Sequence, residues 1–138
     1  MLNKMIQQAQ LFVLCLMCGI GSVGANEESG VIGLWKTEPV TDIGYLHISI
    51  EPCDEKLCGT IVFAFDPEGN NNPTYEHIGK QMVWNMVPKS ESSWGSGKIW
   101  DPRGDRVYNS KMIIKGDVLS VSGCFLLFCD GQDWERVK

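Results

Sequence analysis

The stretch RVYNSKMIIKGDVLSVS, at positions 106–122, decides the fold class of this chain. Two strand-like runs, 106–115 and 118–122, flank Gly116-Asp117, and such a pair favours a two-residue hairpin turn. The second run alternates apolar and polar residues, which is the period of a strand with one buried face. This part of the chain therefore predicts an antiparallel β-hairpin.

The same pattern extends outward from this hairpin. Further strands are predicted at 33–37, 45–50, 59–65, 80–87, 97–100 and 133–137, and a polar segment interrupts them at 66–79. Asp101-Pro102-Arg103-Gly104 is a turn, because Pro presets φ at its second position and Gly tolerates a left-handed backbone. The fold class is therefore all-β: a small eight-stranded antiparallel up-and-down barrel, whose closure leaves no free sheet edge. Eight strands enclose room for side chains or for one small ligand.

Four cysteines lie in two Cys-x4-Cys segments, CDEKLCG at 53–59 and GCFLLFC at 123–129. A zinc site usually uses shorter spacing, and a redox pair favours Cys-x2-Cys at the start of a helix. Each segment here separates two strand-like runs instead. A four-residue hairpin loop would bring its flanking positions opposite one another, so we predict the disulfides Cys53–Cys58 and Cys124–Cys129.

The first 25 residues indicate export. One lysine precedes an apolar run that ends Val23-Gly24-Ala25, as in a secretory signal peptide cut after Ala25. The alternative, a membrane anchor, needs roughly 20 apolar residues. The residues before Cys15 and Cys18 are also not the small ones that a lipoprotein signal needs. We expect residues 1–25 to be cleaved and residues 26–138 to form one domain, periplasmic or secreted.

The charge of the chain excludes some partners. The formal net charge is −5 for the whole sequence and about −6 once the segment containing Lys4 is removed. An acidic domain without a cluster of Lys and Arg is not expected to bind nucleic acid or anionic membrane surfaces. No later apolar run approaches membrane length.

A Gly-x-Trp at Gly33-Leu34-Trp35 and an Arg at position 136 resemble the lipocalin pattern. In that pattern the Trp closes one end of the barrel beneath an Arg of the last strand. The resemblance implies a cation–π contact between Trp35 and Arg136.

The spacing across the whole chain resembles one family more specifically. G-x-W is followed by I-x-P-C-x4-C-G-x-I, N-P, W-x-x-G-x-I-W-D-P-x-G-x-x-Y and L-x-V-x-G-C-x4-C-x-x-Q-x-W-x-R. This is similar to a bacterial family of exported domains of unknown function with a lipocalin-like, calycin-type β-barrel. The resemblance implies a fold and an exported location but no activity. Where that family tends to be basic, after Asn72-Pro73, this chain has Thr74-Tyr75-Glu76-His77. The difference argues against an anionic ligand at this loop.

The sequence contains no recognisable catalytic or metal-binding motif. His47 and His77 have no recognisable nucleophile motif around them, so no catalytic residue is assigned and an enzyme is not expected. The oxygen-rich segment 66–72 lacks the EF-hand spacing, so a solvated turn cluster is preferred to a calcium site. No cofactor and no metal are predicted.

Five aromatic residues are the candidates for a ligand cavity or its rim: Trp84, Trp94, Trp100, Phe125 and Phe128. The alternative for the tryptophans is that they fill the core. Within GCFLLFC, either two of the four large residues fold inward as a cap, or they form an exposed contact surface. The predicted function is a non-catalytic binding module for a small apolar or amphipathic ligand in the cell envelope. The alternatives are a module with a filled barrel that contacts an envelope protein and, third, an enzyme of unknown reaction.

Overall fold

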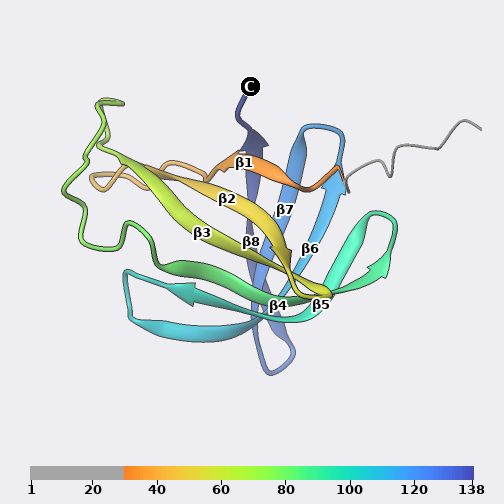
Figure 1. Ribbon diagram of the computed structural model, residues 1–138. Coiled ribbons are helices and arrows are strands. Elements are labelled where there is room, and N and C mark those ends of the chain that lie inside the picture. Colours follow the sequence, from red (N-terminus) through yellow and green to blue (C-terminus); the bar gives the residue numbers. More distant parts are fainter. Residues whose placement is uncertain (1–29) are drawn as a thin grey trace, which may run out of the picture.

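Eight antiparallel strands close into a barrel in the computed structural model, which describes residues 30–138 (Figure 1). The strands are β1 (Gly33–Lys36), β2 (Tyr45–Cys53), β3 (Lys56–Phe65), β4 (Gln81–Ser90), β5 (Ser93–Asp101), β6 (Arg106–Lys115), β7 (Val118–Phe125) and β8 (Phe128–Arg136). Each strand pairs with the next along the chain, and β1 closes on β8 through Trp35↔Arg136. The predicted up-and-down barrel is confirmed.

The predicted signal peptide, residues 1–25, lies outside the described residues. In the part of the chain that is described, no helix has the length and apolar character needed to cross a membrane.

The hydrophobic core fills one half of the barrel. Alternation along β2 turns Ile48 and Ile50 inward, and both are completely buried. They pack with the other core residues, which include Trp35, Ile61, Val83, Met86, Trp94, Met112, Leu119 and Trp134. Gly59 permits this density, because a Cβ there would lie only 2.7 Å from side-chain atoms of Ile50 and Val83.

One end of the barrel is closed by Trp35 and Arg136. The Trp35 indole is completely buried, and its Nε1 donates to the carbonyl of Val31 at 2.8 Å. The guanidinium carbon of Arg136 lies 4.4 Å from the Trp35 ring centroid, which is the contact that the lipocalin resemblance implied. Gly33 has a φ of 139° and leaves space beside Arg136, so a side chain at this position would strain the backbone and crowd the guanidinium.

Both predicted disulfides, Cys53–Cys58 and Cys124–Cys129, are present. The predicted four-residue loops are wrong, because β3, β7 and β8 extend beyond their cysteines and leave two-residue turns at Asp54-Glu55 and Leu126-Leu127. The first residue of each turn adopts a left-handed backbone, with φ 56° and 54°, which lets the ladder run to the tip. Cys124 and Cys129 are direct cross-strand partners, whereas Cys53 is paired in register with Lys56.

Candidate ligand-binding cavity

The barrel is hollow at the end opposite Trp35 and Arg136. A cavity of about 1210 Å³ opens there. Its mouth is formed by the β1–β2 connection (37–44), the β3–β4 connection (66–80), the β5–β6 turn and the tip of the β7–β8 hairpin. In Figure 1 the green β3–β4 connection and the cyan β5–β6 turn lie on the same side of the barrel. Four connections from distant parts of the sequence therefore surround one opening.

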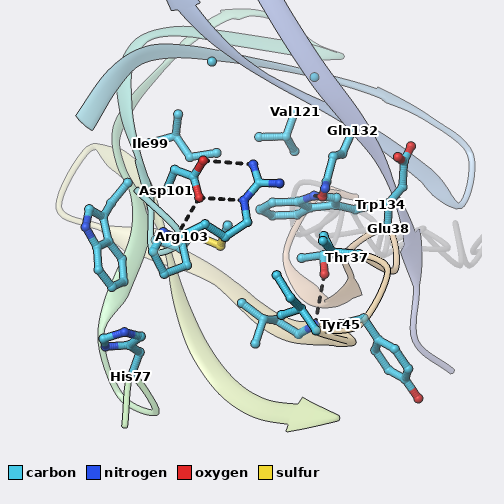
Figure 2. A pocket seen from close by; sticks show the side chains of 18 of the residues that line it. Thr37, Glu38, Tyr45, His77, Ile99, Asp101, Arg103, Val121, Gln132 and Trp134 are labelled. Atoms are coloured by element: carbon cyan, nitrogen blue, oxygen red, sulfur yellow. Dashed lines mark hydrogen bonds and ion pairs between the residues drawn. The ribbon is translucent and has the colours of Figure 1, made fainter. Parts of the chain in front are cut away.

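The inner part of the cavity is apolar. Its lining side chains there come from six strands: Leu46, Ala64, Met82, Ile99, Val121 and Trp134. Figure 2 shows Ile99, Val121 and Trp134 around the space, with Gln132 beside the indole. The Trp134 Nε1 donates to Gln132 Oε1 at 3.1 Å, and the buried Thr37 Oγ1 accepts from the Leu46 amide at 3.0 Å. The polar atoms at this depth are thus already paired with one another, which leaves an apolar surface for a guest.

An ion pair stands at the mouth. Arg103 donates from Nε and Nη2 to the two oxygens of Asp101, each at 2.9 Å, and its backbone amide donates to Asp101 Oδ1 at 3.0 Å (Figure 2). These hydrogen bonds, chiefly the one from the Arg103 side chain, lower the pKa of Asp101. The same contact raises the pKa of Arg103, and the charges of Asp101 and Asp130 add to that effect. The pair is a bidentate contact of fixed geometry that faces the cavity.

Aromatic side chains of the β3–β4 connection form one side of the mouth. The His77 ring makes edge contacts with Tyr75 and Trp100, at centroid distances of 5.1 and 4.9 Å. Burial raises the pKa of Tyr75, with smaller contributions from the charges of Glu76 and Asp101. The buried His77 Nδ1 has no hydrogen-bond partner among the described residues.

The β1–β2 connection forms the side of the mouth opposite the aromatic side chains of the β3–β4 connection. Glu38 Oε1 accepts a hydrogen bond of 2.8 Å from the backbone amide of Asp133, which ties this connection to β8. Gly44 has a φ of 106°, and a Cβ there would collide with the backbone of Phe65 and Asp66. Only glycine lets the connection lie this close to the end of β3.

Three of the five candidate residues meet at this cavity. Trp100, Phe125 and Phe128 line it, and the Trp100 Nε1 donates to Asp105 Oδ1 at 2.8 Å. The hairpin tip is exposed throughout: Phe125 by 67%, Leu126 by 81%, Leu127 by 95% and Phe128 by 81%. The alternative in which two of these residues fold inward as a cap is therefore wrong. The turn residues Leu126 and Leu127 are both highly exposed, and Phe125 and Phe128 reach the cavity only at its rim.

Trp84 and Trp94, which were also candidates for a cavity or its rim, do not line this cavity. Trp94 stands near the β4–β5 turn, at the closed half, and is only 5% exposed within the core. Trp84 follows the inward-facing Val83 and so points to the outer face, where it borders a separate hollow beside Cys53 and Asn85. The number of tryptophans indicated that some of them line a cavity. Their positions along the strands decided which of them do so.

The oxygen-rich segment is a turn cluster, as preferred from the sequence. Asp66 accepts hydrogen bonds from the backbone amide of Asn70 at 2.8 Å and from its side chain at 3.2 Å. The backbone hydrogen bond is the main cause that lowers the pKa of Asp66. Across residues 30–138, no group of three or more His, Cys, Asp or Glu side chains is arranged to hold a metal ion.

Several lining residues were not among the sequence candidates. Asp101 stabilises its turn through the Arg103 amide, and it also faces the cavity. Tyr75, His77 and Gln132 likewise line it. The departure of residues 74–77 from the family pattern was a signal that this loop matters. No local pattern shows that β8 residue 132 faces the same space.

The fold and cavity define the class of protein: a lipocalin-like β-barrel, closed at one end and hollow at the other. A solved structure described as "Protein HP1028 from the human pathogen Helicobacter pylori belongs to the lipocalin family" is similar, with a TM-score of 0.63 and 11% identity over 78% of this chain and 82% of that chain. At that identity the likeness concerns the fold alone. Residues 33–136 match the family described as "Uncharacterized protein conserved in bacteria (DUF2147)", and the chain belongs to this family. No curated protein matches the chain.

Proposed function

We propose that this protein is an exported, non-catalytic binding module that holds a small apolar or amphipathic ligand in the mouth cavity of its barrel. The observation that carries the proposal is the cavity itself. Its volume of about 1210 Å³ is ample for a small molecule, since ligand sites typically occupy roughly 300–1,000 Å³. The apolar inner surface supplies burial, and polar groups gathered at the mouth supply orientation.

Export to the periplasm or beyond is supported by the chemistry of the cysteines. All four cysteines of the described chain are joined in disulfides, which persist in oxidising compartments. The sequence of residues 1–25 has the features of a secretory signal.

The alternative function, contact with an envelope protein by a filled barrel, is less well supported because the barrel is hollow at one end. Its remaining support is the exposed apolar tip Phe125–Phe128. Phe125 and Phe128 also line the cavity, so the same tip serves equally as the rim that a bound molecule touches.

Native mass spectrometry of protein purified from the periplasm of its own bacterium tests the proposal. We expect a mass excess that disappears on denaturation, with release of a small molecule. Ile99→Trp places a large ring in the cavity and should abolish the excess, because Ile99 lines it.

Ile113→Trp is the matched control, since Ile113 is 42% exposed on β6 and does not line the cavity. It should retain the ligand. Equal native and denatured masses for the unsubstituted protein, or equal retention by both variants, would contradict binding in this cavity.

A further inference from the structure

The charges around the mouth are unequal. Four carboxylates line the cavity (Glu38, Glu76, Asp101 and Asp130), against the single guanidinium of Arg103. Glu76 is highly exposed at the rim, with a side-chain exposure of 81%. Like charges around a concave opening add to one another and set the sign of the potential that a guest meets on entry. Among the lining residues, negative charge therefore prevails.

The lining guanidinium is already neutralised. Both of its hydrogen bonds to Asp101 are 2.9 Å long, and the Asp130 charge acts on it as well. An anionic guest could reach Arg103 only by displacing Asp101, whose side chain is 27% exposed. That exchange would break both hydrogen bonds and leave the carboxylate of Asp101 without its charged partner. The mouth is therefore poorly suited to a carboxylate or phosphate group.

Aromatic rings surround the same opening and attract positive charge on their faces. Two lysines of the chain already occupy such positions at the outside of the mouth. Lys36 Nζ lies 4.4 Å from the centroid of Tyr45, and Lys80 Nζ lies 5.2 Å from that of Trp100. Neither lysine lines the cavity. Within residues 30–138, no lysine or arginine makes such a contact with the further rings of the lining: Phe65, Tyr75, Tyr108, Phe125 and Phe128.

We propose that the ligand of this cavity is an amphipathic cation, with an apolar chain or ring system inside the barrel and an ammonium-type head group at the mouth. The inference rests on the proposed function and specifies its ligand class. The apolar inner wall buries the body of the molecule. The carboxylates and ring faces of the mouth stabilise its positive head.

Three probes of equal chain length and different charge test this: decyltrimethylammonium and decanoate, each below its micellar concentration, and 1-decanol below its solubility limit. Binding is measured by titration calorimetry and by the fluorescence of the protein, in which Trp100 and Trp134 line the cavity. We expect the cation to bind tightest, with an affinity about tenfold higher than that of decanoate. The difference arises because the cation gains several exposed charge contacts and one cation–π contact. Added salt should reduce this preference.

Glu76→Gln removes one charge from the rim. It should weaken binding of the cation by about threefold and leave binding of 1-decanol unchanged. Glu68→Gln is the matched control, because Glu68 lies on the same connection but does not line the cavity. If the cation does not bind tightest of the three probes, or if the two variants weaken its binding equally, the proposed cationic ligand is overturned and the binding module remains intact. Failure of all three probes to bind overturns the binding module itself.

Discussion

The two ends of the barrel carry the same backbone device with opposite side chains. At each end a disulfide staples a hairpin whose two-residue turn begins with a left-handed residue, Asp54 at the closed end and Leu126 at the open end. The first turn, Asp54-Glu55, is polar, as a solvated turn should be. The second places Leu126 and Leu127 in water beside a hollow interior. The staple geometry therefore does not require apolar residues, and those at the open end need another reason.

The backbone of the open tip is also strained relative to that of the closed tip. Aspartate tolerates a left-handed backbone, because its short polar side chain can hydrogen-bond locally, whereas leucine rarely adopts it. Such outliers concentrate where function imposes them. Exposure and strain at Leu126 together distinguish the open tip from the closed tip, and both agree with the contact role proposed for the open end.

The largest expected difference in stability between the two ends is that between two tryptophan-to-alanine variants. Trp35→Ala at the closed end should lower the free energy of unfolding by about 3–5 kcal/mol, because it leaves a cavity in a packed core. Trp100→Ala at the open end should cost much less, because that indole borders space that is already empty. Urea denaturation of the two variants measures both.

Arg136→Ala should also destabilise the closed end, through loss of packing on Trp35 as well as loss of charge. If Trp35→Ala and Arg136→Ala melt like the unsubstituted protein, closure of this end by the two residues is wrong.

Removal of a disulfide should have the next largest effect on stability. Replacing either pair with serine should cost about 2 kcal/mol, because each closes a short loop whose constraint on the unfolded chain is small. Both variants should still fold. Peptide mapping without reduction should recover Cys53 linked to Cys58 and Cys124 to Cys129, and a linkage between the two hairpins would falsify the pairing.

The ion pair of the open end should contribute less. Asp101→Asn should lower stability by no more than about 1 kcal/mol at neutral pH, because Arg103 is more than half exposed. Since the pKa of Asp101 is lowered from its usual 3.8, the stabilisation is present above that pH and lost as the pH falls through the lower value of the folded state. Urea titrations should show the two proteins converging in strong acid. A stability difference that persists there would mean that Asp101 acts through something other than its charge.

The smallest effect on stability belongs to the tip. Replacing both Leu126 and Leu127 with serine should change the free energy of unfolding by less than about 0.5 kcal/mol, because both side chains are exposed. The same double variant should weaken retention of the native ligand if the tip forms its rim. A large drop in melting temperature would instead place the tip in the core and end the distinction between the two ends.

The strands near the open tip show the limit of local patterns. Residues 128–132, FCDGQ, have no alternation that signals a strand, and β8 was predicted to begin only at 133. It begins at Phe128, because β7 offers an adjacent edge and the two strands pair in register from Val118↔Glu135 to Phe125↔Phe128. A neighbouring strand supplied the hydrogen bonds that local propensity did not predict.

The sequence by itself determined the all-β class, the number of strands, the disulfide pairs and the Trp35–Arg136 contact. The first three follow from short-range information, namely alternation, turn residues and cysteine spacing, whereas the contact was implied by the resemblance to the lipocalin pattern. Only the tertiary structure decided that the barrel is filled at one end and hollow at the other. It also decided that Trp94 is buried while Trp100 borders the opening. The physical reason is that a cavity is a property of the spacing between side chains from all strands and connections, and no single segment of the chain carries that spacing.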